Sequence, residues 1–299
     1  MDQTVPVAQM YERLLELAAP LAPLDLPLLD APGATMASDL LLDEKVVIKS
    51  GAKINSTQIA LAASLGLDRL PARPHPRVVI ISAGDDLVEP GSKLADEDDE
   101  FESNSWFLTT FVREAGAHAF RVHTIPETSE ELKLIIEDQL VRADLIVISG
   151  ESQDESFELI NSVLSQLGDI TTVIPNLAES GKHSYGTIGP DKTPIVTLPG
   201  DHIGNYLSAE IFIRPMILKM LANNEIKRPS KKAKLSKSVN IEADKANYIR
   251  GRLKDDGSVE PLENQGSIAT LSLADCLITL GEKDKKVSSG DLVNIIMID

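Results

Sequence analysis

Cysteine is nearly absent from this chain of 299 residues, since Cys276 is the only one. A single cysteine excludes an intramolecular disulfide, and no cluster of Cys and His has the spacing of a zinc site. Basic side chains are also scarce: 29 Lys and Arg stand against 46 Asp and Glu, which gives a formal net charge of −17. A surface this acidic disfavours nucleic acids as partners and repels anionic lipid.

Long apolar runs are missing as well. No stretch approaches the roughly 20 apolar residues of a membrane span, and the N-terminus lacks the basic region and apolar stretch of a signal peptide. We therefore expect a cytoplasmic protein with no direct membrane insertion. Hydrophobic residues still make up 42% of the chain, which is ordinary for a globular protein that buries a substantial core.

The centre of the chain contains three short apolar segments, each of which runs into a loop that contains glycine: 78–82, 145–149 and 195–198. Helical patterns separate them, one of which begins with the capping-box pattern Thr128-x-x-Glu131 and another of which is interrupted by Pro215. This alternation predicts an α/β protein whose central domain is a three-layer αβα unit with a mostly parallel sheet. In such folds, ligands bind at the carboxyl edge of the sheet.

The N-terminal region, residues 1–74, combines helical patterns with short strands. Residues 5–19 place apolar side chains on one helical face, Ser56 could cap a second helix, and a proline-rich hinge follows at residues 71–76. We expect this short helix and strand region to serve as a linker or in dimerisation.

Beyond the central domain, residues 75–222, the chain changes character twice. The linker 223–237 contains the basic run 227–234, which reads as a solvated segment or as a docking patch for an acidic partner. Residues 238–299 alternate short strands with turns such as Asp256-Gly257, and they predict a small all-β, barrel-like domain.

Several segments carry specific motifs. Residues 82–91 read Ser-Ala-Gly-Asp-Asp-Leu-Val-Glu-Pro-Gly, residues 102–105 read Glu-Ser-Asn-Ser, and Pro-Gly follows the last apolar segment at 199–200. Residues 143–150 and 289–293 add Ala-Asp-Leu-Ile-Val-Ile-Ser-Gly and Ser-Gly-Asp-Leu-Val. Together these segments resemble the MoeA family, the molybdopterin molybdenumtransferases, which include the C-terminal domain of gephyrin.

The resemblance implies a molybdopterin-binding domain of the MoaB/Mog type, a homodimer, and insertion of molybdate into adenylyl-molybdopterin with release of AMP. It implies Mg²⁺ as the cation, held by Asp85 and Asp86. By position, it implies catalytic roles for Asp86, Glu127, Glu158 and Lys182. The residues that it places at the molybdopterin ligand are Gly84, Asp85, Ser149, Gly150, Gly181, Lys182, Pro199 and Gly200.

The chain departs from the family's pattern in two ways. The family inserts a separate domain after its first strand segment, whereas residues 43–45 pass directly to Val46. The ligand loops also gain acids, namely Glu151, Asp154, Glu155, Glu179 and Asp201. Of these, Glu179 stands where the family has a lysine. One carboxylate ~5 Å from a phosphate costs roughly 3 kcal/mol at an effective dielectric near 20. We therefore expect anionic ligands to bind weakly.

Three functions remain open. The first is a MoeA-like protein with impaired or lost molybdenum insertion that acts as a dimeric, gephyrin-like scaffold for a peptide or protein partner. The second is an active molybdenumtransferase. The third is a regulatory protein that binds a cationic or neutral small molecule, which an acidic rim would favour.

The acidic loops and two histidines leave alternatives of their own. The acids either form a solvated loop or bind a divalent metal through oxygen ligands from Asp85, Asp86, Glu151, Asp154 and Glu158. His183 and His202 could be ligands or bases, but without an obvious partner we expect them at the surface.

Overall fold

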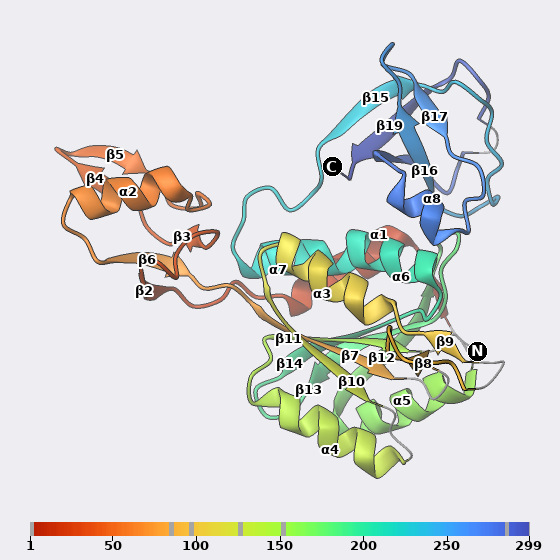
Figure 1. Cartoon of the computed structure of the whole chain (residues 1–299), viewed down its shortest axis with the longest axis horizontal. Helices are drawn as coiled ribbons and strands as arrows, with labels where there is room; N and C mark the ends of the chain where they lie inside the picture. The colour runs from red at the N-terminus through yellow and green to blue at the C-terminus, as the bar shows by residue number, and fades with distance from the viewer. Residues whose placement is uncertain are drawn as a thin grey trace.

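The structure is a computed structural model that describes residues 3–83, 87–95, 99–124, 128–150, 154–284 and 287–298. Three parts are visible in Figure 1: a central domain, a C-terminal β domain lying above it, and a small N-terminal module that projects to one side. The predicted fold class is confirmed, because the central domain is a three-layer αβα unit and the C-terminal domain is built on an antiparallel β-sheet with one short helix. Among the described helices, none combines the length and the apolar character that crossing a membrane requires.

The central sheet has seven strands in the order β1-β12-β13-β14-β11-β7-β10. Neighbouring strands are parallel except at β13, which runs antiparallel to both β12 and β14. The strands are β1 (Gln3–Val5), β7 (Arg77–Ala83), β10 (His118–Thr124), β11 (Leu145–Gly150), β12 (Gly168–Pro175), β13 (His183–Ile188) and β14 (Thr193–Leu198).

Both faces of this sheet are covered by helices. In β7, Val78 and Ile80 join one apolar cluster while Val79 and Ile81 join the other, as expected of a parallel strand buried on both sides. On one face lie α1 (Val7–Leu17), α3 (Asn104–Glu114), α6 (His202–Ser208), a π-helical stretch η1 (Ala209–Ile213) and α7 (Arg214–Met220). On the other face lie α4 (Ser129–Leu140) and α5 (Asp154–Leu167). Thr128 caps α4 through the main-chain N–H of Glu131, as its sequence pattern predicts.

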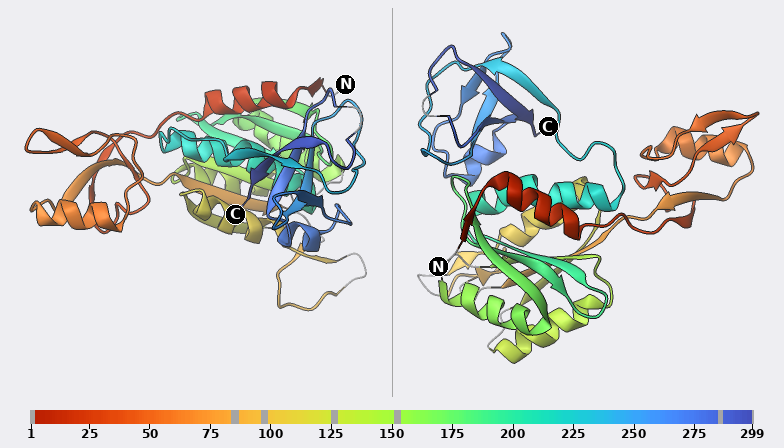
Figure 2. Two further views of the ribbon diagram at one scale, coloured as in Figure 1. Left: turned by 90° about the horizontal axis from the view of Figure 1, so that it is seen from above. Right: turned by 180° about the vertical axis from the view of Figure 1, so that it is seen from behind.

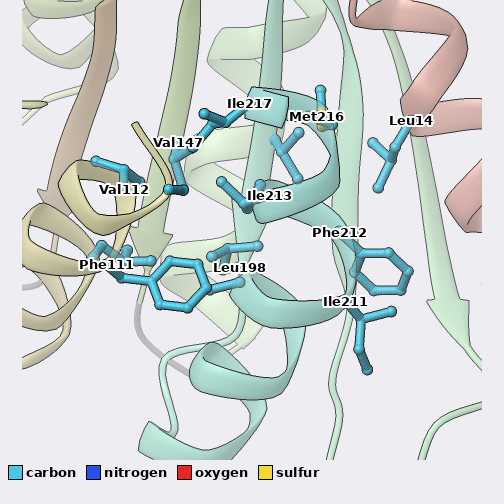
Figure 3. Packing of buried hydrophobic residues seen from close by; sticks show 14 of the residues in the cluster. Leu14, Phe111, Val112, Val147, Leu198, Ile211, Phe212, Ile213, Met216 and Ile217 are labelled. Atoms are coloured by element: carbon cyan, nitrogen blue, oxygen red, sulfur yellow. The ribbon is translucent and has the colours of Figure 1, made fainter. Parts of the chain in front are cut away.

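The last helix of the central domain is interrupted where the sequence predicts a break. Pro215 has no N–H to donate to the carbonyl one turn earlier, and the five residues before Arg214 widen into the π-helical stretch η1. Ile211, Phe212 and Ile213 still pack into the core, as Figure 3 shows together with the residues around them.

Two N-terminal elements belong to the central domain, although the sequence groups them with residues 1–74. Strand β1 extends the sheet by pairing in parallel with β12, and α1 buries Met10 and Leu14 against the same cluster as α7. A three-residue edge strand leaves no periodic signal in the sequence, so its partner could not be predicted.

Residues 24–73 form the N-terminal module, most of which projects from the side of the central domain (Figures 1 and 2). It has an apolar cluster of its own. Its helix α2 begins after Asn55 rather than at a capping Ser56, because Asn55 and Gln58 form a reciprocal capping box. The module contains β2 (Leu24–Pro27), β3 (Thr35–Met36), β4 (Leu40–Leu42), β5 (Lys45–Ile48), α2 (Ser56–Ser64) and β6 (Arg69–Arg73).

A tight turn joins β4 to β5 at the position where the MoeA family is expected to insert a domain. Asp43 and Glu44 have φ values of 48° and 62°, and the two strands pair on either side of them. Positive φ at both central residues is the geometry of a two-residue hairpin turn. The short connection in the sequence is therefore a closed hairpin.

The C-terminal domain is a curled antiparallel sheet in the order β15-β19-β18-β16-β17. Gly257, with φ 78°, forms the hairpin turn between β16 and β17 that the sequence predicts. Residues 230–234, expected as part of a solvated linker, form the edge strand β15 and pair with β19. Its elements are β15 (Ser230–Lys234), β16 (Asn247–Leu253), β17 (Val259–Pro261), α8 (Ile268–Ser272), β18 (Cys276–Leu280) and β19 (Leu292–Met297).

Candidate ligand-binding site at the carboxyl edge of the central sheet

The three predicted strands end together at one edge of the sheet. Ser149 of β11 pairs with Ser82 of β7 on one side and with Leu198 of β14 on the other. Because the three strands are parallel, the loops that follow them leave from the same carboxyl edge, which is where open α/β sheets bind ligands. The structure thus brings together the strand ends that the sequence singles out.

Several predicted site residues lie outside the described part of the chain. These are Gly84, Asp85, Asp86, Glu127 and Glu151, as well as the side chains of Asp154 and Glu155. Helix α5 begins as early as Asp154, so residues 154 and 158 are one turn apart, and the side chain of Glu158 is exposed. Within the described residues, no group of three or more His, Cys, Asp or Glu could hold a metal ion.

A buried polar cluster lies at the ends of β7 and β11. Asn205 of α6 donates from Nδ2 to Ser149 Oγ at 3.0 Å and to the carbonyl of Pro199 at 3.1 Å. Neither Asn205 Oδ1 nor Ser82 Oγ, both buried, has a hydrogen-bond partner in the described part of the chain. An unsatisfied buried polar group costs about 1–3 kcal/mol, so these two oxygens suit a ligand or water that donates to them.

The loop 179–182 lies beside the loop 199–200. A methyl group added at Gly181 would touch the ring of Pro199 at 3.6 Å. From the other side, Asn104 donates from Nδ2 to the carbonyl of Gly200 at 2.6 Å. Ser149, Gly150, Gly181, Pro199 and Gly200 therefore gather at one edge, as the resemblance implies.

Lys182 and His183 differ in their surroundings. The Nζ atom of Lys182 lies 5.6 Å from the centre of the Phe157 ring, which is a cation–π contact with the first turn of α5. His183, expected at the surface, is instead fully buried, with Nδ1 3.0 Å from the carbonyl of Gly181 and Nε2 2.8 Å from Ser208 Oγ. Burial lowers the pKa of His183 to about 4, although the hydrogen bond that the ring donates to the carbonyl of Gly181 opposes this shift, so the imidazole is neutral at neutral pH.

Two of the acids that were expected to repel an anion have other roles. Asp201 Oδ1 accepts the main-chain N–H of Gly204 at 2.7 Å and caps α6. Glu179 receives two hydrogen bonds from Arg250 of the C-terminal domain, Nη1 to Oε2 at 2.6 Å and Nη2 to Oε1 at 2.9 Å. The expectation that both acids oppose an anionic ligand is therefore wrong for Glu179, whose charge is paired, and Asp201 is bound at a helix N-terminus.

A second arginine–carboxylate cluster positions the start of α3. Glu102 is buried and accepts from the main-chain N–H of Ser105 at 2.7 Å and from Arg121 Nη2 at 3.1 Å. Arg121 also contacts Glu89 at 2.6 Å and lies over the Trp106 ring at 4.6 Å. This cluster fixes the turn that holds Asn104 in contact with the carbonyl of Gly200. The motif at 102–105 did not reveal this role.

The residues that sequence reasoning missed are Asn205, Arg250 and Arg121. Asn205 carries a weak signal, because it lies in the first turn of the helix that follows Pro199-Gly200. Arg250 and Arg121 carry none, since each acts through a partner distant in the sequence or through burial that the sequence does not display.

Comparison with known proteins identifies the relatives of this chain. Residues 232–298 match the model of the MoeA C-terminal region (domain IV). The chain is 27% identical over 272 residues to molybdopterin molybdenumtransferase 1 of Mycobacterium tuberculosis, an alignment covering 88% of this chain and 64% of that protein. It is 31% identical over 211 residues to molybdopterin molybdenumtransferase 2 of the same organism, covering 69% and 52%. The chain thus spans less than two thirds of the length of these relatives.

The fold has solved counterparts. The crystal structure of a molybdopterin biosynthesis MoeA protein from Pyrococcus horikoshii superimposes with a TM-score of 0.84 at 16% identity, covering 99% of this chain and 100% of that one. At this identity the match concerns the fold, and the sequence matches supply the family. The sequence and the fold together place the chain in the MoeA family of molybdenum cofactor biosynthesis proteins.

Proposed function

We propose that the chain binds molybdopterin or adenylyl-molybdopterin at the carboxyl edge of the central sheet, and that it inserts molybdenum slowly. The observation that carries the binding proposal is the pair of buried oxygens of Ser82 and Asn205, which lack a hydrogen-bond partner among the described residues and lie beside glycine-containing loops. The printed names of the relatives, molybdopterin molybdenumtransferases, support this class of ligand for the present chain.

Slow insertion follows from the cations of the site. Molybdate and an adenylated pterin are both anionic, so their reaction needs lysines, N–H donors or a bound cation. Lys182 supplies one positive charge, but Glu179 stands where the resemblance places the first of the family's two lysines in this loop. Arg250 cannot replace that lysine, because its side chain is fully buried and bound to Glu179. Loss of one charge-assisted hydrogen bond, worth about 1.5–3 kcal/mol, lowers a rate or an affinity by roughly 10- to 100-fold.

Isothermal titration calorimetry tests binding. Molybdopterin should bind the wild-type chain, and Lys182→Ala should weaken binding about tenfold. Lys231→Ala, which removes an exposed lysine from the C-terminal edge strand, is the matched control and should bind as the wild type does. Absence of binding to folded wild-type protein at millimolar molybdopterin would overturn the proposal.

Release of AMP tests the chemistry. With adenylyl-molybdopterin and molybdate, we expect AMP to appear far more slowly than the ~1–1,000 turnovers per second that are usual for enzymes. A turnover within that range, together with tight binding, would show that Glu179 does not impair insertion.

A second candidate function is a homodimeric scaffold for a peptide or protein partner. It is supported by the apolar side chains that the N-terminal module exposes: Leu24, Leu29, Leu41, Leu42 and Val46. Exposed apolar surface on a projecting module favours an interaction site. Light scattering should give twice the mass of the chain, and Leu41→Asp with Val46→Asp should shift it toward the monomer. Leu292→Asp, an equally apolar exposed site outside the module, is the control.

A further inference from the structure

Arg250 is anchored in the C-terminal domain before it reaches the site. It lies on β16 with no exposed side-chain surface. The side-chain amide of Gln265 binds both polar groups of its main chain: the N–H of Arg250 donates to Gln265 Oε1 at 2.8 Å, and the carbonyl of Arg250 accepts from Gln265 Nε2 at 3.0 Å. Its guanidinium also donates to the carbonyls of Tyr248 and Gln265. The two hydrogen bonds to Glu179 therefore start from a fixed point.

Glu179 opens the loop that carries Gly181 and Lys182. Its backbone is in the left-handed region, with φ 54°, a conformation that costs a residue with a side chain about 1–3 kcal/mol. The loop is also close-packed on α6, because a methyl group added at Gly204 would lie 3.0 Å from the carbonyl oxygen of Glu179. Such a conformation persists where surrounding contacts impose it, and the bidentate contact with Arg250 is one of them.

The main chains of the two domains join just before this loop. Ala178 donates to the carbonyl of Ala246 at 2.8 Å, and Ala246 donates back to the carbonyl of Asn176 at 2.9 Å. Asn176 Nδ2 also donates to the carbonyl of Asp244 at 2.6 Å. The segment 176–179 is thus attached to the C-terminal domain by its backbone and by the ion pair of Glu179 with the buried Arg250.

We propose that Arg250 is a positioning residue for the ligand site: through Glu179, the C-terminal domain holds the loop 179–182 in the conformation that presents Lys182 at the carboxyl edge. The ion pair is suited to this role because a bidentate arginine–carboxylate contact fixes direction as well as distance. Burial of Arg250 with partial exposure of Glu179, whose side chain is 34% exposed, makes the arginine the fixed member and the loop the member that it orients.

The proposal also explains why an acid occupies a position where the family is expected to have a lysine. A lysine at position 179 would bring a second positive charge against a buried guanidinium, and like charges at that distance repel strongly in a medium of low dielectric. Residues 179 and 250 therefore form a coupled pair. Position 179 serves the contact between domains, and Lys182 remains to serve the ligand.

Hydrogen exchange of the free, full-length protein tests the positioning role. Arg250→Met removes the guanidinium at similar length, and we expect amide exchange in residues 179–183 to rise at least tenfold while exchange in β7 and β18 stays at the wild-type rate. Glu179→Gln, which keeps the shape but weakens the pairing, should raise exchange of the same amides by a smaller factor. Arg252→Met, an exposed arginine on the same strand, is the matched control.

The result is decisive for either outcome. Exchange in residues 179–183 that equals the wild-type rate in both Arg250→Met and Glu179→Gln would overturn the proposal. A general rise across the C-terminal domain would also overturn it, since that indicates a role in stability alone. If Arg250→Met does not fold, amide exchange of residues 179–183 in Glu179→Gln decides the question by itself.

The consequence for binding rests on the proposed function. With molybdopterin as the probe, Arg250→Met should weaken binding about tenfold, and Arg252→Met should leave it unchanged. If the wild-type chain does not bind molybdopterin, the proposed function fails, whereas the exchange measurement still decides whether Arg250 positions the loop.

Discussion

The two arginine–carboxylate clusters at the carboxyl edge differ in which partner is buried. In the cluster of Glu102 and Arg121, the carboxylate is 1% exposed and the arginine 20% exposed, and both belong to the central domain. In the pair of Glu179 and Arg250, the arginine is buried and the carboxylate is partly exposed, and the pair joins two domains. The buried member of a pair depends on its partner for compensation, whereas the exposed member retains access to water. The same chemistry therefore stabilises one domain in the first case and orients a loop in the second.

The largest effect should come from leaving the buried carboxylate without its arginine. Arg121→Met leaves the Glu102 carboxylate buried in the central domain without its arginine. An uncompensated buried charge costs about 3–5 kcal/mol. Urea unfolding measures the change in the free energy of unfolding. Arg77→Met breaks a more exposed pair with Asp144 and should cost less than about 1 kcal/mol. Similar losses in the two variants would show that burial does not distinguish these clusters.

The loop 179–182 is also held from inside by His183, and that contact should make stability depend on pH. The folded pKa of His183 is lowered by burial from 6.5 to about 4, so the unfolded chain binds the extra proton between these values. The free energy of unfolding should therefore fall by about 3 kcal/mol as the pH falls from 6.5 to 4. Urea unfolding at several pH values measures this slope.

His183→Gln provides the control for the pH effect. Glutamine can bond to the carbonyl of Gly181 and to Ser208 but does not titrate in this range. The carboxylates common to both proteins contribute equally, so the difference between the two slopes isolates His183. Identical slopes would mean that folding does not lower the pKa of His183.

The sequence predicted the core of the fold because the central strands are continuous apolar runs. The segments at 78–82, 145–149 and 195–198 are buried on both faces, and burial on both faces requires this composition. The antiparallel strand β13 was not predicted, since it contains His183, Ser184 and Gly186 and resembles a loop. Apolar composition therefore revealed the strands of the site, but not the strand that lies beside them.

The candidate site was only partly predictable, for a physical reason. Glycine and serine positions at strand ends are visible as motifs, and Ser149, Gly181 and Pro199 do lie together. The sign of a side chain's effect depends on its partner, and Glu179 lies 71 residues from Arg250. A carboxylate counted from the sequence as a repulsive charge is neutralised in the folded chain, and no local pattern records that pairing.

Restoring a lysine tests the coupling between positions 179 and 250. Glu179→Lys alone should weaken the contact between the domains, because it places a cation beside Arg250. Combined with Arg250→Gln, the lysine becomes available, and molybdopterin should bind up to about tenfold more tightly than to Glu179→Gln plus Arg250→Gln, which lacks Arg250 in the same way. Calorimetry measures the affinity, with Glu179→Gln plus Arg250→Gln as the control that lacks the lysine. Equal affinities of the two double variants would argue against an anion at this position.

The smallest effect separates the two acids that the sequence grouped together. Asp201→Ala removes the cap of α6 and should lower the free energy of unfolding by about 1 kcal/mol, the usual loss for a helix N-cap. Its carboxylate is bound to the N–H of Gly204, so molybdopterin affinity should stay unchanged when measured by calorimetry. Asp201→Asn, which retains a capping oxygen, should restore most of the stability and also leave the affinity unchanged. If both variants instead bound molybdopterin more tightly, Asp201 would repel the ligand by its charge, and the expectation that acids in the ligand loops weaken anion binding would hold at that position.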